Sequence, residues 1–434
     1  MTRSGSTLFV GGMVAGVLVA LIVEEVWPAA GEPDIEHYRD VRDFVRESFV
    51  REVSNEELLD HALHGMVAAL DEYSRYYNRA ESIELERETT GRYTGIGVVF
   101  RRPIADGQVL FALADSPAER AGVRVGDRFL AVDGRPIPGI TETELRELID
   151  DPEQGALEIV VLGLDGARRE LRIRPDSVVD PTVRHARLIG ETRSIGYVSI
   201  LSFSRQTPAE FGRAFEFLTE RGMQALVIDL RRNYGGVLDS AEEIANRFIP
   251  PGAVIVSVEG RGEPVVRRSG SSAGQDGHLP LVLLVDGGSA SASEVLAGAL
   301  QDHLTAVVVG SPTYGKGMVQ TIRKFRETET RAKVTTAYYY SPTHRNFERT
   351  VDPGREHGIL PDVEIPIGAL EQREIHSFLA RYSPPLDAIP AIEAWEAAEG
   401  TKLIERHPAD AQLDAAIALL AGHRPGPQPA LEDK

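Results

Sequence analysis

Apolar residues are spaced differently in successive parts of this chain, and the spacing predicts different kinds of structure. Between residues 38 and 77 they recur every three or four positions, which predicts two amphipathic helices packed as a helical hairpin. From residue 89 to about 176 short apolar runs are separated by turn glycines. This pattern predicts a small β-rich domain with one helix, at 142–149.

From Ser194 onward, predicted strands and helices alternate. The strands are nearly continuous apolar runs, which is typical of a largely parallel sheet with helices on both faces. Ligand sites in such folds lie at the carboxyl ends of the strands. The chain is therefore predicted to be an α/β multidomain protein, with strands at 195–201, 225–230, 281–285 and 306–309 and helices at 209–221, 238–248 and 294–301.

The first apolar feature of the chain is a run of apolar residues and glycines at 8–23, preceded by Arg3. The run is short for a spanning helix, which needs about 20 residues, and fits the core of a signal peptide or a signal anchor. A buried helix of a soluble protein is the alternative. We expect a bacterial exported protein in the periplasm, or one anchored in the inner membrane and facing the periplasm, with 8–23 as the tether.

Composition narrows the class of protein. The 434 residues are enough for two to four domains. A net charge of −19, from 47 basic and 66 acidic residues, argues against nucleic acid as a partner, because phosphate contacts need a basic face. The chain contains no cysteine, and its 11 histidines show no zinc-binding spacing. We therefore expect no metal and no cofactor.

Within the β-rich part, residues 115–134 read Asp-Ser-Pro-Ala-Glu-Arg-Ala-Gly-Val-Arg-Val-Gly-Asp-Arg-Phe-Leu-Ala-Val-Asp-Gly. This stretch resembles bacterial PDZ domains at nearly every position. The resemblance implies that the domain binds a peptide as an added strand and holds its terminal carboxylate in a nest of loop N–H groups. It also implies which residues bind the peptide, namely Thr94, Gly95, Ile96 and Gly97.

Three alternate serines, Ser289, Ser291 and Ser293, lie where the apolar run 281–285 gives way to a helix. A helix N-terminus offers unpaired N–H groups and the positive end of a dipole, which suit an oxyanion. A serine nucleophile needs a base, and no G-x-S-x-G motif or evident histidine partner accompanies these serines. Lys316 lies between two glycines in an uncharged segment, and its amine can be the base if burial keeps it neutral.

The wider pattern around these residues resembles the carboxyl-terminal processing peptidases, a serine-lysine family that includes tail-specific proteases. The resemblance rests on Gly-Ser-Ala-Ser-Ala-Ser-Glu at 288–294, Ala-Gly-Ala-Leu-Gln-Asp at 297–302 and Tyr-Gly-Lys-Gly-Met-Val-Gln-Thr at 314–321. It extends over roughly residues 35–370, the PDZ domain included.

That resemblance implies a role for each matching residue. Ser291 is the expected nucleophile, Lys316 the expected general base and Gln320 the residue that positions the lysine. One oxyanion N–H is expected at Ala292. The other is expected in the R-x-N-x-G-G motif, at Gly235 or Gly236, and the sequence does not choose between these two glycines.

Each motif also has a structural interpretation that involves no catalysis. Small residues and serines at a helix start are common caps and packing residues, and a lone G-K-G is usually a surface turn. A catalytically inactive PDZ scaffold or chaperone would keep the fold without turnover, but three intact site residues count against it. An acyl-CoA enzyme is a remote third alternative, which the PDZ domain and the lack of a nucleotide-binding loop disfavour.

Three segments depart from the family pattern. Residues 71–74 read Asp-Glu-Tyr-Ser instead of D-P-H-S, which is expected to affect only a helix end. Tyr234 replaces a proline, and residues 342–345 read Pro-Thr-His-Arg instead of P-x-G-R. Both of these are expected near the substrate path, and they leave cleavage preference and the need for an activator open.

The expected protein is an exported serine endopeptidase that cleaves proteins after its PDZ domain has bound their free C-termini. Expected partners are such substrates, an adaptor or activator protein, and further copies of the chain in a homo-oligomer. The expected domains are a signal segment at 1–30, a helical region at 35–88, a PDZ domain at 89–176, a serine-lysine protease core at 177–370 and a helical C-terminal region at 371–434 with a disordered tail.

Overall fold

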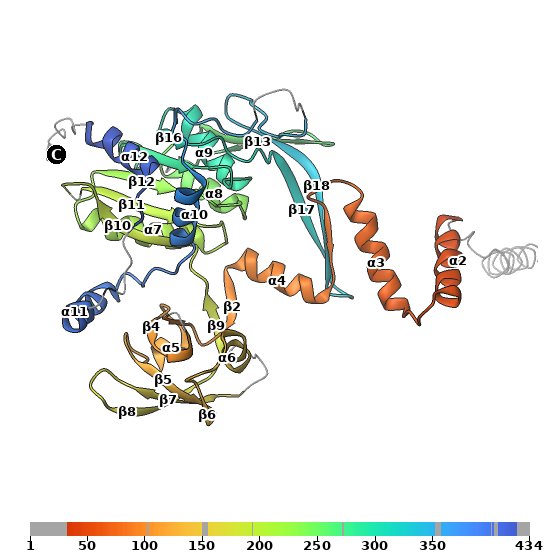
Figure 1. Ribbon diagram of the computed structural model, residues 1–434. Coiled ribbons are helices and arrows are strands. Elements are labelled where there is room, and N and C mark those ends of the chain that lie inside the picture. Colours follow the sequence, from red (N-terminus) through yellow and green to blue (C-terminus); the bar gives the residue numbers. More distant parts are fainter. Residues whose placement is uncertain are drawn as a thin grey trace, which may run out of the picture.

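The computed structural model describes residues 33–101, 104–149, 155–192, 194–270, 273–351, 357–400, 402 and 407–422. The predicted signal segment and the predicted disordered tail lie outside the described residues. Figure 1 shows a mixed α/β body, a smaller β-rich domain below it and two helices extending to one side. This confirms the mixed α/β class. No helix of the described residues is long and apolar enough to cross a membrane.

A six-stranded sheet forms the centre of the body, in the order β10-β11-β12-β15-β16-β19. The edge strand β10 runs antiparallel to β11, and every other neighbouring pair is parallel. All residues of the three central strands β11, β12 and β15 are buried, as their apolar sequences require. The bounds are β10 Val183–Ile189, β11 Ile195–Ile200, β12 Ala225–Asp229, β15 Leu281–Val285, β16 Ala306–Gly310 and β19 Val363–Glu364.

Helices cover both faces of this sheet. On one face α7 (Thr207–Glu220), α8 (Leu238–Asn246) and α9 (Ala292–Asp302) pack on alternate strand residues in the largest apolar core. On the other face α12 (Ala411–Gly422) packs its leucines on the remaining strand residues, including Tyr197. A helix from the far C-terminal region therefore covers the second face of the central sheet.

A second, antiparallel sheet lies beside the first. It has the order β1-β18-β13-β14, with β17 paired to β18 in a long hairpin. The first strand, β1, pairs with β18 across more than 250 residues of chain. The bounds are β1 Arg75–Tyr77, β13 Val254–Gly260, β14 Val265–Arg268, β17 Met318–Phe325 and β18 Thr330–Tyr340.

The β-rich domain has its own apolar core and a four-stranded sheet in the order β6-β5-β7-β8. The chain enters it through β2 and leaves it through β9, and these two strands pair with each other. The domain is thus an insertion in the body. Its elements are β2 Arg92–Gly95, β3 Val98–Phe100, β4 Val109–Ala112, α5 Pro117–Arg120, β5 Arg128–Val132, β6 Arg135–Pro136, α6 Glu142–Ile149, β7 Leu157–Leu162, β8 Arg168–Ile173 and β9 Asp176–Val179.

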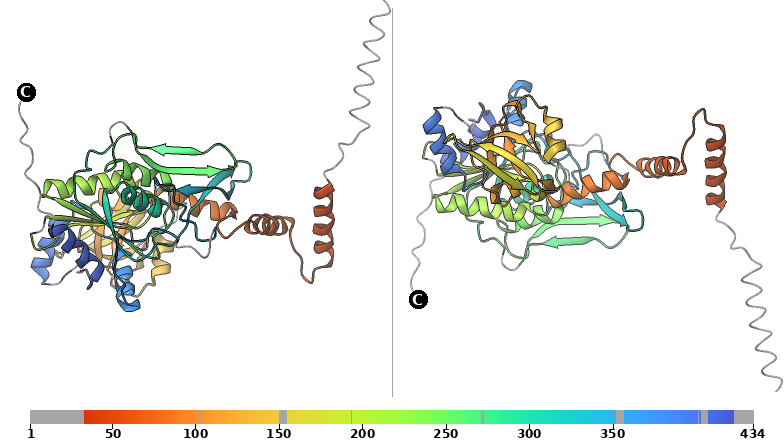
Figure 2. Two further views of the ribbon diagram at one scale, coloured as in Figure 1. Left: turned by 90° about the horizontal axis from the view of Figure 1, so that it is seen from above. Right: turned by 90° about the horizontal axis from the view of Figure 1, so that it is seen from below.

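The two N-terminal helices exist but do not form the predicted hairpin. They are α2 (Pro33–Ser48) and α3 (Asn55–Ala68), and no residue of α2 is buried. Figure 2 shows α2 standing away from the body and at a steep angle to α3. The spacing of apolar residues predicted each helix correctly, but it did not specify what covers the apolar face. A further helix, α4 (Arg79–Thr90), leads into the inserted domain.

Two more helices precede α12 in the C-terminal region, as the helical pattern beyond Leu370 predicted. They are α10 (Ala369–Leu379) and α11 (Ile389–Glu399). In Figure 1, α10 lies against the central sheet, whereas α11 lies lower, beside the inserted domain.

Candidate active site

Ser291 lies at the N-cap position of α9, six residues after Val285, the last residue of β15. Its backbone has φ 57° and ψ −115°, a conformation that a residue with a side chain seldom adopts. Such a conformation costs about 1–3 kcal/mol and persists only where surrounding contacts enforce it. Ser291 is therefore held in a strained position at a helix N-terminus.

The hydroxyl groups of the two flanking serines are already bonded inside the protein. Ser289 donates to the carbonyl of Leu230 at 2.8 Å, and Ser293 donates to the carbonyl of Asn233 at 2.8 Å. Both serines are fully buried, whereas 9% of the surface of Ser291 is exposed. Of the three serines, only Ser291 is thus accessible to a substrate.

Glu294 joins the loop at 286–291, which we call the serine loop, to the loop at 311–317, which we call the lysine loop. Its Oε2 accepts the N–H groups of Ser291 and Lys316, each at 2.8 Å, so the two nitrogens can be no further apart than twice that distance. Its Oε1 accepts the N–H of Gly315 at 2.7 Å and the hydroxyl of Thr313 at 2.6 Å. Burial raises the pKa of this carboxyl, while the four donors oppose that rise.

Sequence reasoning did not assign a role to Glu294. A signal was present, because an acidic residue in an otherwise apolar helix start must either reach solvent or find several donors. Periodicity alone could not show which donors it would find.

The amine of Lys316 lies over an aromatic ring. Its Nζ is 4.6 Å from the ring centroid of Tyr73, and no hydrogen bond joins it to Ser291 Oγ. Burial lowers the pKa of Lys316, and the positive charge of Lys333 lowers it further. Gln320 donates to the carbonyl of Met318 at 3.1 Å and faces Thr335, so it does not hold the lysine in this structure.

The contact with Tyr73 corrects one expectation. The departure at residues 71–74 was expected to affect only a helix end, but Tyr73 contacts the candidate base directly. The departure at 342–345 was expected near the substrate path. Instead Thr343 and Arg345 bind Asp302 at the far end of α9, which is 11 residues and so about 16 Å long.

The R-x-N-x-G-G loop lies directly against the serine. A Cβ added to Gly235 would lie 2.8 Å from Ser291 Cβ and 3.1 Å from Ala292 N, which explains glycine here. The N–H of Gly235 donates to Asn233 Oδ1 at 2.9 Å. Among the described residues, no hydrogen bond uses the N–H of Ala292 or Gly236. These two groups are therefore the available donors near Ser291.

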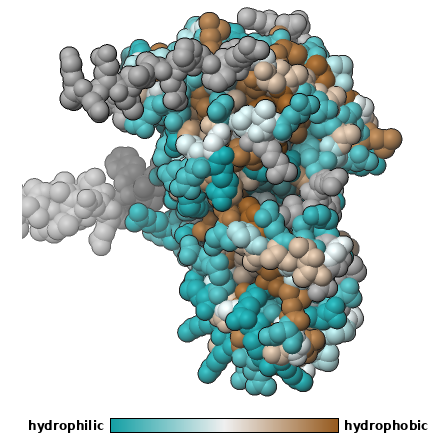
Figure 3. Space-filling view, turned by 90° about the vertical axis from the view of Figure 1, so that its left-hand side faces the viewer, coloured by the Kyte–Doolittle hydropathy of each residue, from teal (hydrophilic) through white to brown (hydrophobic). Residues whose placement is uncertain are grey.

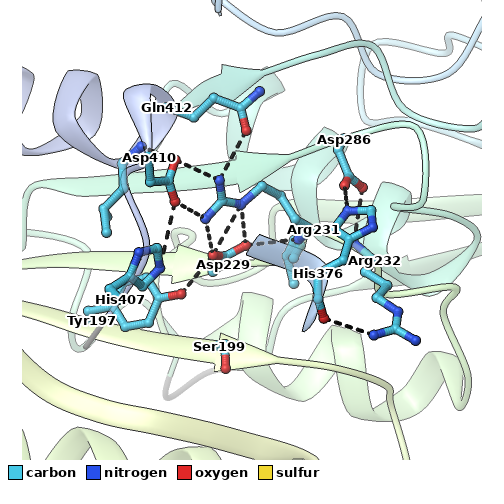
Figure 4. A network of polar contacts seen from close by, with 12 residues as sticks. Tyr197, Ser199, Asp229, Arg231, Arg232, Asp286, His376, His407, Asp410 and Gln412 are labelled. Carbon is cyan, nitrogen blue, oxygen red and sulfur yellow. Dashed lines mark hydrogen bonds and ion pairs between the residues drawn. The ribbon is translucent and has the colours of Figure 1, made fainter. Parts of the chain in front are cut away.

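Behind this loop is a buried network of charges, shown in Figure 4. Arg231 is fully buried between Asp229, at 2.6 Å, and Asp410, at 2.7 Å. Beside it Asp286 accepts the N–H of Arg232 at 3.0 Å and the ring N–H of His376 at 2.6 Å. Burial acts to raise the pKa of Asp286, but these donors lower it overall.

In the inserted domain, the expected peptide-binding residues form a strand end and a turn. Thr94 and Gly95 are the last residues of β2 and pair with β9, so they do not belong to a loop. Ile96 is buried, and Gly97 has φ 75° with Ser116 too close to admit a Cβ. Within the described part of the chain, the N–H groups of Ile96 and Gly97 make no hydrogen bond.

Comparison with known proteins places this geometry in context. Residues 194–365 match peptidase family S41, and residues 112–163 match a PDZ domain. A carboxy-terminal-processing protease of Bartonella bacilliformis is 30% identical over 335 residues, which cover 76% of this chain and 74% of that protein. A carboxyl-terminal-processing protease of Synechocystis is 32% identical over 331 residues, covering 74% and 75%.

A solved structure, the photosystem II D1 C-terminal processing protease, is also similar to this chain. The two are 27% identical, the match covers 74% of this chain and 85% of that one, and the TM-score is 0.43.

Proposed function

The chain belongs to peptidase family S41, the family of the carboxy-terminal-processing proteases, and on that basis we propose that it is a serine endopeptidase with Ser291 as nucleophile and Lys316 as general base. One observation carries the proposal. The buried carboxylate of Glu294 binds the backbone of both residues and so holds the strained serine and the lysine loop together.

In the proposed reaction the neutral amine of Lys316 takes the proton of Ser291 Oγ while that oxygen attacks the substrate carbonyl. The carbonyl oxygen becomes an oxyanion held by the N–H groups of Ala292 and Gly236. We favour Gly236 over Gly235 because the N–H of Gly235 already donates to Asn233. The lysine then passes its proton to the leaving amine, and later activates the water that hydrolyses the acyl-enzyme.

Lys316 must leave Tyr73 before it can act as this base. The present position of its amine suits a resting state, because the ring face attracts the protonated form. The position of Lys316 over Tyr73 is also compatible with a second candidate function, a PDZ scaffold or chaperone without catalytic turnover. A resting enzyme will become active when the lysine is freed, and a scaffold will not.

We propose that the PDZ domain binds the free C-terminus of the substrate. The N–H groups of Ile96 and Gly97 are available for a carboxylate, and β3 pairs with β4 on one side only among the described strands. An extended peptide can therefore add to the open edge of β3 and place its terminal carboxylate at the N–H groups of Ile96 and Gly97.

We further propose export to the periplasm, with a tether through 8–23, and assembly into a homo-oligomer through α2. Large apolar residues of α2 are exposed, among them Val41 and Phe44, and no part of the described chain covers them. A second copy of the same helix would bury this face. An adaptor that binds there is the competing occupant.

The test of the enzymatic proposal follows degradation of an unfolded protein with an apolar, free C-terminus. Wild type should cleave it, and Ser291→Ala and Lys316→Ala should not. Lys324→Ala removes an exposed lysine of the same hairpin and should leave the rate unchanged. Equal rates in all four proteins would exclude the mechanism, and a substrate amidated at its C-terminus that is cleaved as fast as the acid would exclude PDZ recognition.

A further inference from the structure

The C-terminal region contacts the Arg231–Gly236 loop, which we call the oxyanion loop, at two separate places. The first contact is made by α10. His376 donates a ring N–H to Asp286 at 2.6 Å, and its own carbonyl accepts the guanidinium of Arg232 at 2.9 Å. The other oxygen of Asp286 accepts the N–H groups of Arg232 and Gly288. His376 thereby braces the oxyanion loop and the serine loop together.

The second contact lies just before α12. Asp410 binds the buried guanidinium of Arg231 through both of its oxygens, at 2.9 and 2.7 Å, and Gln412 accepts a third N–H of the same group at 3.1 Å. Without these partners Arg231 would keep its ion pair with Asp229 but would be left with buried N–H groups that have no acceptor. The start of the oxyanion loop therefore depends on a carboxylate 179 residues further along the chain.

Between these two contacts the chain leaves the body and docks on the PDZ domain. Ile392 of α11 is buried in one cluster with Phe111, Leu113 and Val178 of that domain. A Cβ on Gly126 would lie 2.5 Å from the indole nitrogen of Trp395, so these surfaces touch closely. In Figure 3, which views the α11 side, apolar surface runs from the body toward the PDZ domain.

This docking is separate from the expected peptide site. The α11 cluster includes Val99, whereas Val98 and Phe100 of the same strand pack into the main PDZ core with α6. Side chains alternate along a strand, so α11 and the main core lie on opposite faces of β3. A peptide added at the open edge of β3 would thus leave α11 in place and could shift it only by moving the domain.

The connection from α10 to α11 is also fixed where the PDZ domain joins the body. Tyr382 donates to Asp180, directly after β9, at 2.8 Å. The guanidinium of Arg184 lies 4.2 Å from the Tyr382 ring centroid and donates to the carbonyl of Ala380 at 2.7 Å. A rotation of the PDZ domain about its two connecting strands must therefore act on the segment that begins at α10.

We propose that α10, α11 and Asp410 couple the position of the PDZ domain to the geometry of the oxyanion loop, with His376 as a positioning residue. The functional meaning of this coupling rests on the proposed peptidase activity. The physical coupling does not, because α10 is held by the oxyanion loop and α11 by the PDZ domain, and the chain between these two helices is itself fixed to the body. A displacement of either helix therefore acts on the other.

The experiment measures hydrogen–deuterium exchange of the peptide that covers residues 231–236, in the full chain. Ile392→Ala removes apolar contact with the PDZ domain and touches no residue of the oxyanion loop. It should speed exchange of the loop by about tenfold, as should His376→Ala, because each releases one restraint on local opening. Glu393→Ala and Glu374→Ala are the controls, on exposed positions of the same two helices, and should change nothing.

The double variant separates coupling from general loosening. If both residues act through one segment, the combined effect of Ile392→Ala and His376→Ala on exchange should be smaller than the product of the single effects. Faster exchange in α11 with none in residues 231–236 would overturn the proposal, and so would independent effects. Hydrogen–deuterium exchange can be measured without any cleavage. A wild type that cleaves no substrate would therefore contradict the proposed peptidase activity, while the exchange rates of residues 231–236 would still test the coupling.

If Ile392→Ala unfolds the chain, Trp395→Phe offers a milder change at the same contact. It replaces the indole that lies against Gly126 with a smaller ring, which reduces the contact with the PDZ domain. The same faster exchange of the loop is expected, and its absence in a folded variant would also overturn the proposal.

Discussion

Lys316 points its amine at the ring of Tyr73, 4.6 Å from the centroid, although its backbone N–H shares a carboxylate oxygen with that of Ser291. The backbone of the candidate base is therefore in place while its amine is directed elsewhere. A cation over a ring face is worth about 0.5–2 kcal/mol. The lysine must overcome that attraction, lose its proton and turn to the serine before it can act.

Replacing Tyr73 with alanine should raise the basal rate of cleavage, by up to about tenfold for a contact of roughly 1.4 kcal/mol. Tyr73→Phe keeps the ring and should behave like wild type in cleavage. Steady-state rates on one peptide substrate test this, and a Tyr73→Ala enzyme no faster than Tyr73→Phe would contradict the resting-state interpretation.

Removing the charge of Lys333 should shift the pH dependence of the reaction. Burial lowers the pKa of Lys316 most, and repulsion from Lys333 lowers it further. Without that repulsion the pKa rises, so less of the amine is neutral at a given pH. The rising limb of kcat/KM against pH should therefore move to higher pH in Lys333→Met, with a lower rate at neutral pH.

The matched control for this shift is Lys324→Met, which removes an exposed lysine on the partner strand of the same hairpin. Its pH profile should coincide with that of wild type. If the two variants shift alike, general surface charge and not local repulsion governs the pKa of Lys316.

Glu294→Gln should cost both stability and activity. The carboxylate accepts four hydrogen bonds, three of them from backbone N–H groups. In the glutamine variant one carboxylate oxygen is replaced by an amide NH2 group, which is itself a donor and cannot accept these bonds. With about 1.5–3 kcal/mol for each hydrogen bond to a charged group, we expect a loss of at least that size in the free energy of unfolding. Denaturant titration measures it.

Ser291→Ala separates the two effects, since it keeps the backbone N–H that Glu294 binds. It should lack activity and unfold at nearly the wild-type denaturant concentration. A Glu294→Gln protein of wild-type stability would show that the shared carboxylate does not hold the two loops together.

Phe44→Ser should weaken self-association of the chain. Phe44 is 68% exposed on α2, and an exposed apolar face of this kind is stable when another helix covers it. Sedimentation velocity should show a smaller species than wild type, while Glu47→Ser, on the same helix, should not change the species. Monomeric wild type over a range of concentrations would rule out the homo-oligomer and favour an adaptor as the occupant.

The sequence by itself determined the parts that depend on local pattern. Apolar runs separated by helical periodicity identified the central strands, because burial on both faces demands nearly continuous apolar residues. The PDZ stretch and the serine and lysine motifs could be recognised from the sequence because each is a short run of consecutive residues. Ser291 was singled out by the resemblance to the carboxyl-terminal processing peptidases, and the bonded hydroxyls of Ser289 and Ser293 are compatible with that choice.

Only the tertiary structure decided how distant residues meet. Three contacts join positions up to 243 residues apart in the sequence. They are the contact of Tyr73 with Lys316, the ion pair of Asp410 with Arg231 and the hydrogen bond between His376 and Asp286. Hydrophobic periodicity reports which face of an element is buried, but not which element covers it. That is why α2 was paired wrongly with α3, and why the C-terminal helices could be predicted as helices without their contacts beside the Arg231–Gly236 loop.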